Sequence, residues 1–330
     1  MSLAMQKPTQ RLSRDGSPSE FDMIARHFTR PARHTGVMLG VGDDCTLLAP
    51  TPGHQLAVSV DTSVAEVHFP HAAPAAAIGH RALAVSLSDL AAMGATPRWC
   101  LMALILDDAD DAWLEPFAQG FDTLCARAGI DLVGGDVTRG PLSVSVTVHG
   151  EVPPGEALTR HGAHEGDLLA VTGSLGGGAG GLAAWQSGER SLDDPLLAAY
   201  LLPEPRLAAG QALRGLASAA IDVSDGLLAD LQHLCDASGL GAALELEALP
   251  LAQGLVERLG EGALQAALSG GDDYELLVGL PEGALEAAQR ALGALGVPLT
   301  VIGRFTATPG IQGVEANGPR GWQHFSGATP

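Results

Sequence analysis

Apolar residues alternate or recur at helical spacing along most of the chain, and the first half shows both patterns. The run from Leu56 to Asp61 alternates like a strand, whereas the alanine-rich run that stops at Gly94 has helical spacing. Strands are predicted over 56–61, 100–106 and 142–149, with helices over 75–93 and 112–128. These elements form one α/β layer, in which Asp61 lies at the end of a strand.

The second half repeats this mixture after the stretch Glu151–Gly155 and a polar loop that runs to Gly166. Strands are predicted over 167–172, 219–222, 243–247, 274–280 and 299–302, with helices after the glycine-rich segment 173–181 and over 207–217, 227–237 and 285–295. The fold class is therefore α/β of the α+β type. We expect a disordered polar tail over 1–20, an N-terminal domain over 21–152 and a C-terminal α/β domain over 153–330.

Composition and charge narrow the class of function. The 330 residues are 46% hydrophobic, and 38 acidic against 18 basic side chains give a net charge of −20, which argues against nucleic acid or an anionic membrane as partner. Four scattered cysteines indicate neither a zinc site nor a redox motif. A membrane helix needs about 18 apolar residues in succession, and no run approaches this length, so we expect a cytoplasmic protein.

The only lysine is Lys7, so the folded part lacks the lysine of a P-loop or of a protein kinase. Aspartates instead stand in glycine-flanked or strand-end segments. They are Asp43, Asp44, Asp61, Asp89, Asp136, Asp222, Asp225, Asp272 and Asp273. Mg²⁺ binds carboxylates together with substrate phosphates, so the set favours magnesium-dependent phosphate chemistry. Each segment alone is equally consistent with an ordinary turn or helix cap.

Some of these aspartates indicate a functional role more strongly than others. Asp89 lies in a helix of otherwise buried composition. Either a metal ion or an arginine, Arg81 or Arg98, neutralises it there, or it lies on an exposed edge of the helix, and we favour the metal ion. Asp225 is consistent with a helix cap, but capping does not explain Asp222. The run Gly176–Gly181 satisfies G-x-G-x-x-G without the acid of a dinucleotide site, so we assign it to close helix packing and leave phosphate contact open.

The ordered set of motifs resembles the thiamine-monophosphate kinases, within the superfamily of aminoimidazole ribonucleotide synthetase. The resemblance spans nearly the whole chain. It is carried by residues 40–45, 59–62 with 68–69, 84–95, 134–140, 157–160, 221–226 and 269–276. Two positions depart from the expected pattern, because Asp272 stands where Glu can occur and Val60 where Thr can occur.

The resemblance implies transfer of the ATP γ-phosphoryl group to thiamine monophosphate, with several Mg²⁺ ions and no assigned general base. Its implied metal ligands are Asp44, Ser59, Val60 through its backbone, Asp61, Asp89, Asp136, Asp222 and Asp225. Its implied ATP contacts are Gly135, Arg160 and Ser224, and its implied substrate contacts are His68, Asp272 and Trp322. It further implies two α/β domains of the aminoimidazole ribonucleotide synthetase-like fold, and a homodimer whose N-terminal sheets pair into a barrel.

Alternatives remain at this point. Trp322 could fill the core instead of stacking on a thiamine ring. A sister enzyme that uses ATP to activate an amide or carbonyl oxygen would keep most of the aspartates. A non-catalytic acidic metal-binding protein is a third hypothesis, which predicts stabilisation by metal that ATP does not increase.

Overall fold

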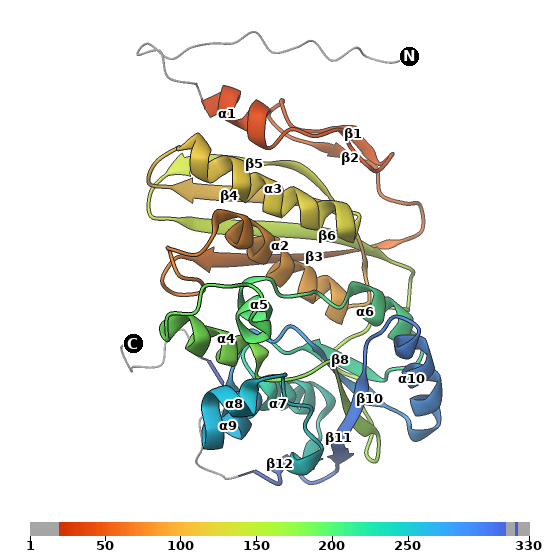
Figure 1. The fold of residues 1–330 in the computed structure, drawn as a ribbon. Helices are drawn as coiled ribbons and strands as arrows, with labels where there is room; N and C mark the ends of the chain where they lie inside the picture. The colour runs from red at the N-terminus through yellow and green to blue at the C-terminus, as the bar shows by residue number, and fades with distance from the viewer. Residues whose placement is uncertain (1–19, 315–320, 323–330) are drawn as a thin grey trace. The chain divides into compact units, whose positions relative to one another are not determined.

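The computed structural model describes residues 20–314 and 321–322, whose contacts form two compact units (Figure 1). Among these residues, the first unit comprises residues 20–51, Val60–Leu83 and Arg98–Val148, and the second comprises Pro52–Ser59, Ala84–Pro97, residues 149–314 and residues 321–322. The predicted tail lies outside the described residues except at residue 20, where helix α1 (Glu20–His27) begins. The domain boundary at 152/153 stays a prediction.

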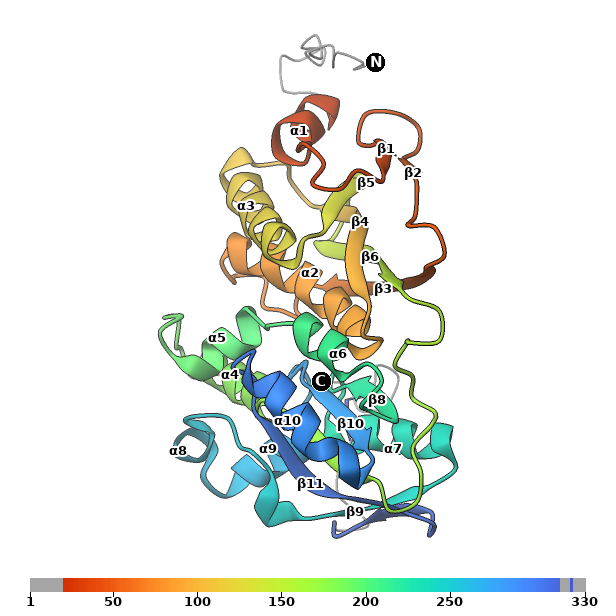
Figure 2. The same ribbon diagram turned by 90° about the vertical axis from the view of Figure 1, so that its right-hand side faces the viewer.

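A four-stranded sheet of order β3-β6-β4-β5 forms the centre of the N-terminal region. Its strands are β3 (Gln55–Val64), β4 (Thr96–Leu106), β5 (Asp131–Arg139) and β6 (Ser143–Val152). Helix α3 (Asp111–Ala128) and residues 75–83 of helix α2 (Ala75–Ala92) lie on the same side of it (Figure 2). The two helices approach closely, because a Cβ atom on Gly79 would collide with the Phe117 backbone. A short hairpin, β1 (Val37–Leu39) and β2 (Leu47–Leu48), precedes the sheet.

Strand β3 presents two different faces because its side chains alternate. Val58 and Val60 are 57% and 60% exposed, whereas Ser63 on the opposite face is buried. Asp61 lies inside this strand, so its predicted position at a strand end is wrong. The apolar side chains of β3 therefore point away from the helix-covered face.

The second unit is built on a six-stranded sheet of order β12-β9-β11-β7-β10-β8. The strands are β7 (Leu168–Thr172), β8 (Ala219–Asp222), β9 (Gly241–Leu244), β10 (Leu276–Leu280), β11 (Leu299–Thr306) and β12 (Gly310–Gln312). All neighbours pair antiparallel except β12 with β9. This mixed, mainly antiparallel sheet confirms the predicted α+β class.

Helices cover both faces of this sheet. They are α4 (Gly177–Gln186), α5 (Pro195–Leu201), α6 (Leu207–Leu213), α7 (Leu227–Ser238), α8 (Leu255–Leu259), α9 (Ala263–Ser269) and α10 (Leu285–Gly293), with short 3₁₀ turns at Leu246–Ala248, Gly260–Gly262 and Glu282–Ala284. Leu169 and Val171 enter one hydrophobic core, whereas Leu168 and Ala170 enter the other. Burial on both faces explains why β7 reads as a continuous apolar run.

Several elements were not predicted from the sequence. They are β5 and α5, together with α1, β1, β2, α8, α9 and β12. Strand β5 continues through Gly134 and Gly135, which had suggested a tight turn, and it pairs in parallel with β4. Helix α5 occupies a segment for which the sequence predicted no helix. Among the residues that the structure describes, no helix is both long and apolar enough to span a membrane.

Candidate active site

The predicted metal ligands belong to both units. Asp44, Val60, Asp61 and Asp136 are in the first, and Ser59, Asp89, Asp222 and Asp225 are in the second. Within the described part of the chain, no three His, Cys, Asp or Glu side chains are grouped so that they could hold a metal ion. The metal assignment therefore stays a prediction, and the two sets are described separately.

In the second unit, Asp222 is the last residue of β8 and is 4% exposed. Its Oδ2 accepts a hydrogen bond of 2.7 Å from Ser88 Oγ, which lies on α2. The chain then turns through 223–226 into helix α7. A nearby contact joins two further predicted ligands, because Ser59 Oγ donates to Asp89 Oδ2.

The turn after Asp222 lies directly against the Asp272 segment. The Asp272 N–H donates to the Ser224 carbonyl, and the Tyr274 N–H donates to the Val223 carbonyl, both at 2.8 Å. Asp272 and Tyr274 have φ angles of 69° and 52°, which non-glycine residues rarely adopt. The fold thus joins two motifs that are far apart in sequence and holds one of them in an unusual backbone conformation.

Trp322 is attached to the same turn. Its backbone N–H donates to the Asp225 carbonyl at 3.0 Å, while the residue is 51% exposed. The alternative that Trp322 fills the core is therefore wrong. Both substrate-contact candidates of this unit, Asp272 and Trp322, lie beside residues 223–225.

Asp230 is a functional candidate that the sequence reasoning missed. Its Oδ2 accepts the N–H groups of Ser224, Asp225 and Gly226 at 3.0, 3.1 and 3.1 Å. Burial, followed by the negative charges of Asp222 and Asp225, raises the pKa of Asp230 to about 7. The available signal was an acidic residue in the first turn of α7, within an otherwise apolar run.

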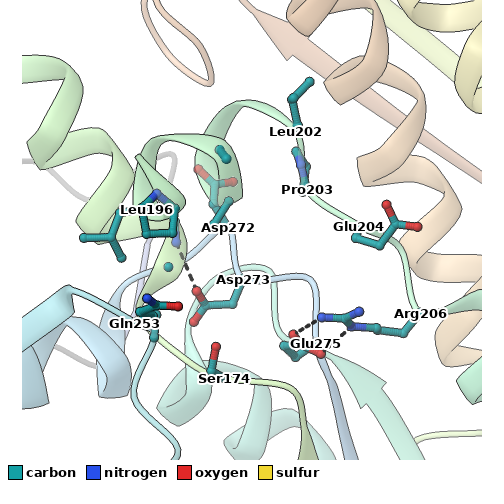
Figure 3. Close-up of a pocket in the computed structure, with 16 residues that line it drawn as sticks. Ser174, Leu196, Leu202, Pro203, Glu204, Arg206, Gln253, Asp272, Asp273 and Glu275 are labelled. Carbon is teal, nitrogen blue, oxygen red and sulfur yellow. Dashed lines mark hydrogen bonds and ion pairs between the residues drawn. The ribbon is translucent and has the colours of Figure 1, made fainter. Parts of the chain in front are cut away.

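A pocket of about 310 Å³ adjoins Asp272 (Figure 3). Leu196 and Leu202 form part of its apolar wall, and Arg206, Asp272 and Glu275 are among its polar residues. Arg206 binds Glu275 with two hydrogen bonds, Nε to Oε2 at 2.7 Å and Nη2 to Oε1 at 2.6 Å. The pocket therefore combines an apolar wall with an excess of acidic groups.

Asp273 ties the glycine-rich segment to this pocket. Its Oδ2 accepts the Gly176 N–H at 2.8 Å, and its Oδ1 accepts the Gly178 N–H at 3.1 Å. A Cβ atom on Gly178 would lie only 2.5 Å from the Gly271 carbonyl oxygen. The glycines thus permit close packing, and two of their amides already bind a carboxyl group.

Asp273 should give stability a pH dependence that an amide variant lacks. Burial, reinforced by Glu275 and Asp272, raises the pKa of Asp273 to about 8, compared with ~3.9 in an unfolded chain. Between these values the unfolded state binds fewer protons, so this group makes the free energy of unfolding fall as pH rises. Urea unfolding at pH 5.5 and pH 8.5 should show that the free energy of unfolding falls less between these pH values in Asp273→Asn than in the wild-type protein. An identical fall in both proteins would contradict this pKa.

In the first unit, Asp44 is exposed on the turn between β1 and β2, where its N–H donates to Asp43 Oδ1 at 2.8 Å. Asp136 is exposed within β5. Gly135, with φ of 152°, packs so closely on Met102 that a Cβ atom would collide with the Met102 backbone. Strand packing therefore explains this glycine without a bound phosphate.

His68 and Arg160 are placed by backbone contacts. His68 Nδ1 accepts the Val64 N–H at 3.0 Å, which leaves the proton of the neutral ring on Nε2. The Arg160 carbonyl accepts from Ser238 Oγ at the end of α7 remote from Ser224. The structure thus does not bring the Arg160 backbone to the Ser224 turn.

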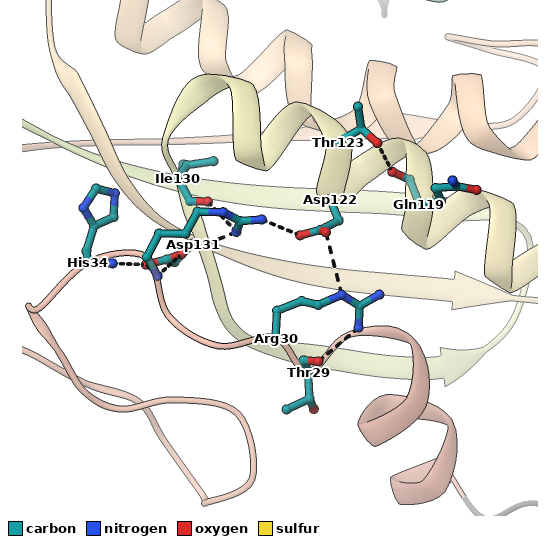
Figure 4. Close-up of polar contacts among 9 residues, drawn as sticks. Thr29, Arg30, His34, Gln119, Asp122, Thr123, Ile130 and Asp131 are labelled. Carbon is teal, nitrogen blue, oxygen red and sulfur yellow. Dashed lines mark hydrogen bonds and ion pairs between the residues drawn. The ribbon is translucent and has the colours of Figure 1, made fainter. Parts of the chain in front are cut away.

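Ion pairs fix the chain segment that leads into the Asp44 hairpin (Figure 4). Arg33 Nη2 donates to Asp122 Oδ1 at 2.9 Å, and Arg30 Nε lies 3.7 Å from Asp122 Oδ2. The His34 N–H donates to Asp131 Oδ2 at 2.8 Å. These arginines therefore have structural acidic partners.

Comparisons with known proteins agree with this architecture. Residues 42–152 match the family model of the AIR synthase related protein N-terminal domain, and residues 164–315 match the C-terminal domain. The chain is 47% identical over 323 residues to thiamine-monophosphate kinase of Escherichia coli K12, covering 94% of this chain and 99% of the relative. The corresponding Salmonella typhimurium LT2 protein is 45% identical, with the same coverage.

Solved structures show the same similarity. The crystal structure of thiamine-monophosphate kinase from Stenotrophomonas maltophilia K279a has a TM-score of 0.81 at 44% identity, covering 87% of this chain and 92% of that one. A structure of AaThiL complexed with AMPPCP and TMP has a TM-score of 0.76 at 30% identity, covering 84% and 89%. The hydrogenase maturation protein HypE of E. coli, at 23% identity and a TM-score of 0.73, shares the fold.

Proposed function

Because the chain belongs to the thiamine-monophosphate kinase family, we propose that it transfers the γ-phosphoryl group of ATP to the phosphate of thiamine monophosphate. The products are thiamine diphosphate and ADP. The observation that carries this proposal is 47% identity to the E. coli enzyme over nearly the full length of both chains. The related structure in complex with AMPPCP and TMP supports the pairing of a nucleotide with this acceptor.

Magnesium is the cation that these residues fit. Aspartate carboxylates are hard oxygen ligands, and at the end of β8 the charges of Asp222 and Asp225 raise the pKa of buried Asp230, after burial itself. Such a concentration of acidic groups favours a bound cation. Bound Mg²⁺ supplies charge neutralisation between two anionic phosphates. Several Mg²⁺ ions would be held by Asp44, Ser59, the Val60 carbonyl, Asp61, Asp89, Asp136, Asp222 and Asp225.

The remaining predicted residues orient the two substrates. Ser224, Gly135 and Arg160 would contact ATP, and the Ser224 contact would use its side chain because Asp230 binds its N–H group. His68 would donate from Nε2 to the substrate phosphate, while Trp322 offers a half-exposed ring for a flat heterocycle. Asp272 borders the pocket of about 310 Å³. A phosphate oxygen is already ionised near neutral pH, so transfer needs no general base.

We also propose a cytoplasmic homodimer. The exposed valines of β3 support self-association, since a strand face with Val58 and Val60 more than half exposed favours a partner surface. Pairing of N-terminal sheets into a barrel would cover it. The described cysteines are free thiols, as expected in a reducing compartment.

Incubation of the purified protein with Mg-ATP and thiamine monophosphate tests the function directly. We expect thiamine diphosphate and ADP in equal amounts, and neither product when EDTA is present. ADP without thiamine diphosphate would favour a sister synthetase, and turnover of a formylglycinamidine-type substrate would confirm that alternative. Stabilisation by metal alone, with no ADP and no further effect of ATP, would indicate a binding protein.

A further inference from the structure

We propose that Asp230 is a positioning residue for phosphoryl transfer, whose carboxyl group fixes the turn that carries Asp222, Ser224 and Asp225. The inference rests on the proposed function, and the resemblance assigns no role to this residue. Asp230 is 3% exposed and lies in the first turn of α7. It acts through the residues of the turn and does not itself need to touch a substrate.

The hydrogen-bond geometry distinguishes this role from ordinary helix capping. A cap supplies an acceptor for the first N–H groups of the helix. Asp230 Oδ2 accepts the N–H of the N-cap residue Gly226, as in a capping box, but it also accepts the N–H groups of Ser224 and Asp225, which precede the N-cap. All three distances are 3.0–3.1 Å. Three amides that converge on one oxygen define the backbone conformation of the turn.

The carbonyl groups of the same turn hold the other candidate residues. The Ser224 carbonyl accepts the Asp272 N–H, and the Asp225 carbonyl accepts the Trp322 N–H. One turn therefore links its own candidate metal and ATP ligands to both substrate candidates of this unit. In the same peptide groups, the N–H points to the side opposite the carbonyl and donates to Asp230.

Stabilisation of helix α7 alone does not explain a buried carboxyl group at this position. Asp230 is 3% exposed, and burying a polar group costs free energy unless hydrogen bonds compensate it. A Ser or Asn cap would stabilise the helix without burying a carboxyl group. The three converging N–H groups compensate the burial of Asp230, and its presence is explained if this oxygen is needed to shape the turn.

The test compares Asp230→Ala with Asp236→Asn, a change at an exposed acid on the same helix. We expect Asp230→Ala to lower kcat and to raise the Mg²⁺ concentration that gives the half-maximal rate. The two fold-changes multiplied together should be about 10 to 100, as for residues that orient metal ligands. Hydrogen exchange of the 224–226 amides should become faster. Asp230→Asn should recover most of both properties, because its amide oxygen can accept the same N–H groups.

Asp230→Glu replaces the alanine variant if the latter does not fold, since it keeps the carboxyl group but displaces its oxygens by one methylene. Rates and amide exchange within twofold of Asp236→Asn, in folded Asp230→Ala or Asp230→Glu, would overturn the proposal. Lower thermal stability with unchanged kcat and Mg²⁺ dependence would also overturn it. A wild-type protein that makes no thiamine diphosphate would instead refute the proposed function, while the exchange measurement would still report on the turn.

Discussion

Asp44→Asn should lower the turnover number for thiamine diphosphate formation about a thousandfold while the protein stays folded. In the proposed site Asp44 is a metal ligand, so loss of its carboxylate should remove several kcal/mol of charge stabilisation in the transition state. Each ~1.4 kcal/mol changes the rate tenfold. The fold should tolerate the change because Asp44 is exposed on a turn. The measurements are kcat at saturating substrates and the melting temperature.

Asp43→Asn is the matched control, because Asp43 lies on the same exposed turn and its amide oxygen can still accept the Asp44 N–H. We expect nearly wild-type activity from it. Asp136→Asn, at an exposed position on β5, should show the same loss as Asp44→Asn. Substantial residual activity in Asp44→Asn, or equal losses at positions 43 and 44, would contradict the multi-metal assignment.

Arg206→Ala should lower the free energy of unfolding by about 3 kcal/mol, which is typical when one partner of a buried ion pair is removed. The side chain of Glu275 is 6% exposed, and it would lose both hydrogen bonds from the guanidinium group. Thr172 Oγ1, at 2.7 Å from Glu275 Oε2, would remain as a neutral donor and could not compensate the charge. Urea unfolding measures the difference.

The double variant Arg206→Ala/Glu275→Gln separates a buried charge from lost packing. It should be more stable than Arg206→Ala alone, since the uncompensated carboxylate is gone. A single-variant cost of about 1 kcal/mol or less, as for exposed ion pairs, would show that solvent screens this pair. A double variant that is no more stable than Arg206→Ala would lead to the same conclusion.

The sequence pattern correctly predicted elements whose formation depends mainly on nearby residues. Strand β8 has the predicted bounds, and α2 ends one residue before the predicted end. Strand β5 was missed because Gly134 and Gly135 suggested a turn, whereas contact with Met102 of β4 requires a glycine there. Helix α5 did have a local signal, since Asp194 caps it and Pro195 is its first residue.

The sequence predicted the motifs of the candidate site, but it did not predict the contacts between them. The resemblance marked Asp222, Asp225 and Asp272, but their connection through residues 223–225 depends on hydrogen bonds between segments some 50 residues apart in the numbering. Asp230 is an acidic residue among the buried apolar residues of the first turn of α7, but helical periodicity does not reveal what a buried carboxyl group binds. Only the tertiary structure shows which amides it binds.

The carboxyl groups that bind the backbone amides of two turns also affect inhibitor design. The amides of Gly176 and Gly178 bind Asp273, and those of Ser224, Asp225 and Gly226 bind Asp230. A phosphate-mimicking fragment aimed at either turn would compete with a covalently attached acid, whose effective concentration a free ligand rarely matches. Fragments that fill the pocket beside Leu196 and Asp272 avoid this competition and offer the better starting point.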